Sequence, residues 1–164
     1  TTPDSAARRG APCTAMTPDP ETLDAPGHET PLVSAFTDRT LAHADWTHAA
    51  HLEVCWFAVQ RLGAAAALDH LRDEIRSYNT VVGTKNTDTS GYHETITAYY
   101  VGAVADVAGR AGATLADVLA DPSCDLDAPL RHWRRDTLMS VAARRAWRSP
   151  DLAPLPWRDP PTFR

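Results

Sequence analysis

The sequence has little of several features that often identify a class of protein. Its 164 residues include only three cysteines, an odd number with no close pairing. That fits a reducing cytoplasm better than a disulfide framework. No apolar run reaches the roughly 18 residues that span a bilayer, and no charged-then-apolar leader resembles a signal peptide. We therefore expect a cytoplasmic protein that does not act in a membrane.

Positive charge is also scarce. Lysine occurs once, at Lys85, and the formal net charge is −5. Nucleic-acid binders neutralise phosphates with clustered Lys and Arg, and no basic stripe with interleaved aromatic residues is present. We expect a small-molecule substrate as the partner and no nucleic acid. The oligomeric state stays open.

What the sequence does contain is helical periodicity without any period-two strand pattern. Prolines crowd both ends. We predict an all-α fold, a compact bundle of four to six helices with proline-rich, mostly irregular terminal segments. Residues 1–29 have few large apolar side chains, so we expect them to be disordered or loosely draped. Residues 30–148 form the helical domain, and residues 149–164 form an extended tail packed on it.

Capping residues predict where several helices begin. Thr30, followed by Pro31, is a plausible first cap. The next helix is capped by Asp45 or Thr47 and stops at Gly63. Further caps and starts are predicted at Ser90 for a helix that runs to about Arg110, at Thr114 in an acidic capping box, at Pro129 and at Ser140.

The most unusual segment is the helix predicted for residues 47–62, which is apolar on nearly every side and so typical of the centre of a bundle. It carries His48 and His51 on one stripe with Cys55, because successive residues are about 100° apart. A third histidine, His93, stands beside Glu94 at the start of the helix that we expect after Ser90. If the two helices face each other, the three imidazoles converge.

Such a convergence predicts a metal centre at His48, His51 and His93. Three protein ligands with an open position for water are typical of catalytic zinc, and two histidines with a carboxylate suit non-haem iron. Glu94 and His93 would be the catalytic residues, with Glu94 as general base or fourth ligand. At a helix start, the dipole favours the Glu94 carboxylate and a neutral His93 imidazole.

The residue pattern therefore favours a small-molecule enzyme, a metal-dependent hydrolase or lyase using zinc or iron. Alternatives are a non-haem iron oxidoreductase and a metal-free binding or self-protection protein with a His/Tyr-lined pocket. A purely structural hydrogen-bonding role also fits, since buried histidines need partners. Substrate contacts are expected from four side chains: Tyr78, Asn79, Thr97 and Tyr100.

Other polar residues have simpler interpretations. Cys55 and Trp46 are expected in the core. A locally basic stretch is expected to form a solvated face, although one of its arginines could hold a substrate carboxylate or phosphate. Its members are Arg131, Arg134, Arg135, Arg144 and Arg145.

Three segments together resemble a group of small bacterial helical proteins. They are Trp46-x-His48-x-x-His51-Leu52, then Tyr78-Asn79, then Ser90-Gly91-Tyr92-His93-Glu94-Thr95-x-Thr97. The similar part covers about residues 32 to 157, including the tail. The resemblance implies that these segments form one domain, but the group carries no settled activity and implies no mechanism.

Overall fold

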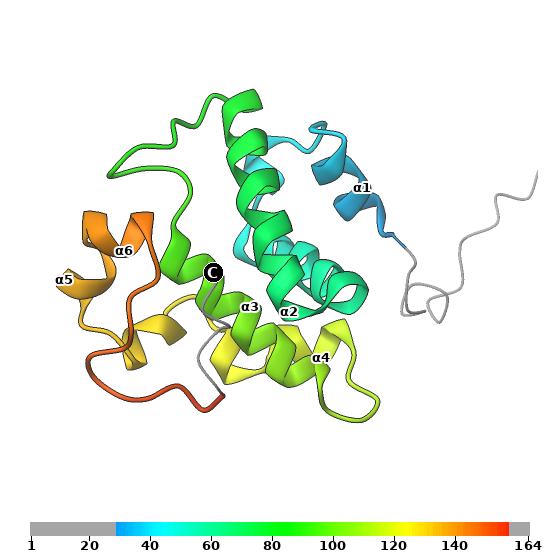
Figure 1. Cartoon of the computed structure of the whole chain (residues 1–164). Helices are drawn as coiled ribbons and strands as arrows, with labels where there is room; N and C mark the ends of the chain where they lie inside the picture. The colour runs from blue at the N-terminus through cyan, green and yellow to red at the C-terminus, as the bar shows by residue number, and fades with distance from the viewer. Residues whose placement is uncertain (1–28, 158–164) are drawn as a thin grey trace, which may run out of the picture.

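The computed structural model describes residues 29–157, and within them every regular element is helical (Figure 1), which confirms the all-α prediction. The expectation for residues 1–28 lies outside the described residues, as does the end of the tail after residue 157. The α-helices are α1 (Pro31–Thr37), α2 (His48–Val81), α3 (Glu94–Ala108), α4 (Leu115–Ala120), α5 (Arg135–Leu138) and α6 (Val141–Arg145). Three short 3₁₀ helices lie among them: η2 (His43–Asp45), η3 (Pro122–Cys124) and η4 (Ala128–Arg131).

Most of the predicted caps are confirmed. The hydroxyl oxygens of Thr30, Thr47 and Ser140 accept hydrogen bonds from main-chain N–H groups in the first turns of α1, α2 and α6. At α4, Thr114 and Asp117 form the reciprocal capping box. Each of these bonds satisfies an N–H group that the helix itself leaves without a partner.

Gly63 interrupts α2, as its position in the sequence predicted. Its φ of 74° and ψ of 161° are non-helical, so residues 48–62 and 64–81 are two helical segments joined by a sharp bend. A residue with a Cβ adopts that conformation at a cost, and glycine does not. The bend turns the second segment so that His51, on the first, and Leu71, on the second, both face one cavity.

The start of α3 differs from the prediction. Ser90 lies in an exposed turn and does not cap the helix; the cap is His93, whose ring nitrogen Nδ1 accepts a hydrogen bond from the Ile96 N–H at 3.3 Å. The helix begins three residues later than expected from Gly91. Gly91 has a φ of 75°, and a Cβ there would meet Asn86 and the Lys85 carbonyl. The chain therefore makes one more tight turn before the helix can start.

Helix α3 occupies the centre of the molecule. It packs against α2, α4, η3 and α6, and Figure 1 shows it between α2 and the short α5 and α6. Its side chains at Tyr99, Ala103, Val104 and Val107 are fully buried. The sequence pattern had favoured the helix of residues 47–62 for this position.

Between α4 and residue 157 the chain forms only short elements. The single helix expected from Pro129 is instead η4 followed by the four-residue α5. Between them Trp133 is fully buried and donates its indole N–H to the Arg148 carbonyl at 3.0 Å. Burying this ring turns the chain away from a continuous helical path.

The tail, as far as residue 157, is bonded to the helical body. The Asp151 carboxylate accepts hydrogen bonds from the Arg134 N–H at 2.8 Å and the Thr137 hydroxyl at 2.6 Å. Leu155 and Trp157 pack on the core, whereas the side chain of Leu152 is 52% exposed. The tail thus supplies the cap of α5 that the local sequence lacks.

No described helix is both long and apolar enough to cross a membrane.

Candidate functional site

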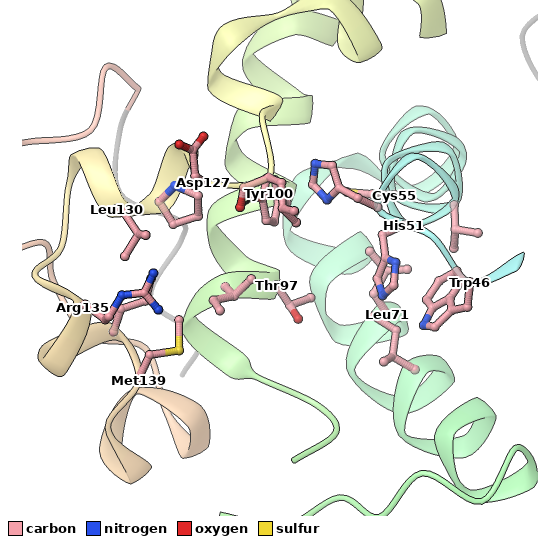
Figure 2. Close-up of a pocket in the computed structure, with 17 residues that line it drawn as sticks. Trp46, His51, Cys55, Leu71, Thr97, Tyr100, Asp127, Leu130, Arg135 and Met139 are labelled. Carbon is pink, nitrogen blue, oxygen red and sulfur yellow. Dashed lines mark hydrogen bonds between the residues drawn. The ribbon is translucent and has the colours of Figure 1, made fainter. Parts of the chain in front are cut away.

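A cavity of about 540 Å³ opens between α2, the face of α3 and the short elements η4 and α5. In Figure 2 one wall carries Trp46, His51 and Leu71, and the opposite wall carries Leu130, Arg135 and Met139. Thr97 and Tyr100 of α3 lie between the walls. The remaining lining residues are His48, Val54, Cys55, Ile75, Ile96, Leu126, Asp127, Pro129 and Leu138. The lining is mostly apolar, with few polar groups, as in sites for small organic molecules.

His51 is the best-oriented polar group of this cavity. Its Nδ1 lies 2.7 Å from the Thr47 carbonyl, to which it donates a proton, and its ring stacks on Trp46 with centroids 3.7 Å apart. The other nitrogen, Nε2, has no hydrogen-bond partner among the described residues. A neutral ring in this tautomer carries its lone pair on Nε2, so this atom can accept a proton.

The surroundings of His51 keep its ring neutral. The residue has an exposed edge, but the cavity wall surrounds its ring on most sides. This desolvation lowers the pKa of His51 to about 4, and it outweighs the hydrogen bond with the Thr47 carbonyl, which raises the pKa. The nearby His48 lowers the pKa further. At neutral pH His51 is therefore a hydrogen-bond acceptor at the cavity wall.

His48 joins α2 to the segment after α4. Its Nε2 lies 2.7 Å from the Cys124 carbonyl and donates to it, and its ring meets the Tyr100 ring edge-on with centroids 5.1 Å apart. Tyr100 in turn donates its hydroxyl proton to the carbonyls of Asp125 and Leu126. Both rings line the cavity, but their hydrogen bonds fix the main chain of residues 124–126.

His93 lies outside the cavity lining and has a structural role. The residue is 7% exposed. Its Nδ1 accepts the Ile96 N–H, and its Nε2 donates to the Leu138 carbonyl at 2.9 Å. Both ring nitrogens are therefore used by main-chain groups, one to cap α3 and one to hold the end of α5.

Glu94 likewise does not line the cavity. Its carboxylate accepts two hydrogen bonds from Arg72, at 3.0 and 2.6 Å, and one from the Tyr92 hydroxyl at 2.9 Å. Burial raises the pKa of Glu94, but the Arg72 and Tyr92 hydrogen bonds outweigh it, so the net shift is downward. An anion held in this way links α2 to α3 and is a weak proton acceptor.

The residues predicted to form the metal centre therefore divide into two groups. His48 and His51 line the cavity together, whereas His93 and Glu94 lie outside its lining. Across residues 29–157, no group of three or more His, Cys, Asp or Glu side chains is placed to hold a metal ion. His93 as it stands has no ring nitrogen left for a metal, because both already hold hydrogen bonds.

The four predicted substrate contacts divide in the same way. Thr97 and Tyr100 line the cavity. Tyr78 is fully buried in the core, where its hydroxyl donates to the Leu41 carbonyl at 3.2 Å. Asn79 is 6% exposed, and its amide donates to Asn86 at 2.9 Å, which holds the loop after α2. The Tyr78-Asn79 pair thus serves the fold.

The wall opposite His51 was not predicted from the sequence. Leu130, Met139 and Arg135 belong to short elements with no strong periodicity, so no helical face indicated that they would meet α2. The one available signal was the basic stretch that contains Arg135. Trp46, expected in the core, also faces the cavity (Figure 2), where its indole supports the His51 ring.

No family model, curated protein or solved structure matches this chain. What the cavity does must therefore be inferred from its geometry.

Proposed function

We propose that the protein binds a small, largely apolar molecule in the cavity between α2, α3 and α5, with His51 accepting a hydrogen bond from it. The supporting observation is the cavity itself, about 540 Å³ with mostly apolar lining. Ligand sites are usually of about 300–1,000 Å³, apolar, with a few fixed polar groups. Of the functions that the sequence suggested, this one corresponds to the metal-free pocket lined by histidine and tyrosine.

A binding screen tests the proposal. Ligand-observed NMR with a library of small apolar compounds is run on the full chain and on Thr97→Phe, which places a ring in the middle of the cavity. We expect several compounds to bind the unchanged protein and not the variant. Leu62→Phe is the matched control, because Leu62 is exposed on α2 and outside this cavity. Compounds that bind Thr97→Phe equally well would place the binding site elsewhere.

Acid–base catalysis on the bound molecule is a second candidate function. The observation that favours it is the fixed His51 ring, with Nδ1–H donating to a carbonyl and Nε2 left to accept a proton. A general base contributes roughly 10²–10⁴-fold to a rate when its pKa is near the working pH; the pKa of His51, lowered to about 4, makes it a weaker base at neutral pH. Incubating each bound compound with the protein and analysing it by mass spectrometry distinguishes the two functions. A changed product that disappears in His51→Gln supports catalysis, and unchanged recovery supports binding alone.

The metal-dependent hydrolase or lyase stays a prediction. In the conformation described, its ligands would have to come from His48 and His51 with a further donor that is not His93, whose ring nitrogens both hold hydrogen bonds. Metal analysis of protein purified without chelator or His-tag tests it. Stoichiometric zinc or iron that is lost in His51→Ala would support the metal centre over the metal-free pocket.

A further inference from the structure

Arg135 differs from the arginines beside it. The side chains of Arg131 and Arg134 lie within 4.0 Å of carboxylates, at 2.8 Å from Asp125 and 3.7 Å from Asp151. The side chain of Arg135 has no hydrogen bond or ion pair with any other described residue, and it lines the cavity. Figure 2 shows its guanidinium extending from the wall towards the side where Thr97 lies.

The rest of the cavity leaves this positive charge unbalanced. Among the described residues, Asp127 is the only other charged member of the lining, and its carboxylate points away from the cavity centre (Figure 2). It lies 4.0 Å from Arg131 and is largely exposed. The remaining lining is apolar apart from the two histidines, Thr97, Tyr100 and a thiol. The cavity thus has a cationic wall and an apolar interior.

A single guanidinium on an exposed residue at the wall of an apolar cavity is suited to a monoanion. Arg pairs with a carboxylate through two parallel hydrogen bonds, and such charge-assisted bonds are about twice as strong as neutral ones. A phosphate dianion would bring a second negative charge for which the lining has no second cation. A carboxylate on an apolar body fits both parts of the cavity.

We propose that the ligand of this cavity is an apolar monocarboxylic acid, bound with its carboxylate on Arg135 and its hydrocarbon body between Leu130, Met139 and Leu71. This inference rests on the proposed function, since it names the class of molecule that the cavity binds. His51, on the opposite wall, is left to accept a hydrogen bond from a hydroxyl or amine at the far end of the molecule.

Matched probes test the charge. Octanoate, its neutral isostere octanamide and octyl phosphate are titrated into the full chain by calorimetry at low salt, with NMR shifts locating the site. We expect octanoate to bind at least about tenfold more tightly than octanamide, because only the carboxylate forms charge-assisted hydrogen bonds with a guanidinium. Octyl phosphate should bind more weakly than octanoate.

Two single-charge variants complete the experiment. Arg135→Gln should reduce octanoate affinity to that of octanamide, while Arg134→Gln, which removes the same charge from the adjacent residue outside the cavity, should leave the octanoate preference intact. Equal binding of octanoate and octanamide, both abolished by Thr97→Phe, would overturn the carboxylate inference and leave the proposed function standing. Failure of all three probes to bind would overturn the inference, and the wider compound screen would then decide the proposed function separately. Tighter binding of octyl phosphate would overturn it in favour of a phosphate ligand.

Discussion

The imidazole of His51 is restrained by contacts on two sides. The Thr47 carbonyl fixes Nδ1–H and the Trp46 indole lies against the ring face. A ring held this way loses little freedom when a ligand hydrogen-bonds to Nε2, so we expect the proposed ligand to bind more tightly than it would to a mobile side chain.

The titration of His51 provides the first prediction. Since desolvation lowers its pKa to about 4, we expect the midpoint of its ring proton shifts, measured by two-dimensional NMR against pH, well below the unfolded value of 6.5. The neutral folded form contributes stability that is present above pH 6.5 and lost as the pH falls towards the folded pKa. A midpoint at or above 6.5 would contradict this.

A second prediction concerns the ion pair between Arg72 and Glu94. Glu94→Gln leaves a guanidinium partly buried against a neutral amide, so we expect roughly 2–4 kcal/mol less free energy of unfolding by urea denaturation. Asp69→Asn is the control: Asp69 pairs with the same Arg72 but its side chain is 60% exposed, so its loss should cost at most about 1 kcal/mol. Similar costs for both variants would show that burial of Glu94 is unimportant. Ligand binding should survive in both.

At the scale of elements, the junction of α3 and α5 is held by the two nitrogens of His93. His93 can hold this junction only as a neutral ring with its proton on Nε2, because Nδ1 must accept from Ile96 and Nε2 must donate to the Leu138 carbonyl. Burial lowers the pKa of His93, and the positive charge of Arg144 also lowers it. We therefore expect the junction to weaken in acid.

We predict that His93→Ala lowers the free energy of unfolding by about 1–3 kcal/mol, through loss of the cap and an unsatisfied buried carbonyl. His93→Asn restores the cap alone and should recover part of the loss. For the unchanged protein, stability should fall as the pH drops below 6.5, because acid protonates Nδ1 and removes the cap. Urea denaturation from pH 8 to pH 5 measures this, and an equally steep decline in His93→Asn would assign it to other groups.

The sequence predicted the elements well where short-range chemistry determines them. The Thr caps and the Gly63 break depend on hydrogen bonds and dihedral angles within a few residues, so they can be recognised locally. The prediction that Ser90 caps the helix was wrong. The turn before α3 is shaped by Asn86 and Lys85, which approach Gly91 from earlier in the loop. His93 was predicted to be a site residue because a ring nitrogen can bind a metal. A ring nitrogen can equally accept a hydrogen bond from a helix N–H group, as a cap does.

At the scale of the whole molecule, contact with the tail limits the size of the side chain that α3 can carry at residue 102. Gly102 lies mid-helix, where Ala would ordinarily stabilise by about 0.5–1 kcal/mol. A Cβ at this position would meet the indole of Trp157. The glycine is therefore explained by the close approach of the tail.

A double-mutant cycle tests this packing. We predict that Gly102→Ala fails to stabilise the protein, since it displaces Trp157, and that the same change in a Trp157→Ala background stabilises it by about 0.5–1 kcal/mol. Unfolding free energies of the four proteins give the coupling. Additive effects would mean that the indole does not occupy this position in solution.

The candidate site could be predicted only in part, because one of its walls depends on contacts between segments far apart in the sequence. His48, His51, Thr97 and Tyr100 lie on long helices whose faces can be worked out from periodicity, and all four line the cavity. The wall with Arg135 depends on distant contacts, such as Asp151 capping α5 from the tail. Nothing in residues 128–139 alone reveals that partner.

Because Asp151 follows both walls of the cavity in the sequence, the cavity can be completed only after residue 151 has been made. The α2 wall and the α3 face leave the ribosome first, with Leu71, Ile75 and Ile96 still uncovered. The Arg135 wall follows but stays without its cap until residues 148–157 have been translated. A nascent chain thus passes through a stage that exposes an apolar surface, and at that stage a hydrophobic ligand or a chaperone would compete for the same contacts.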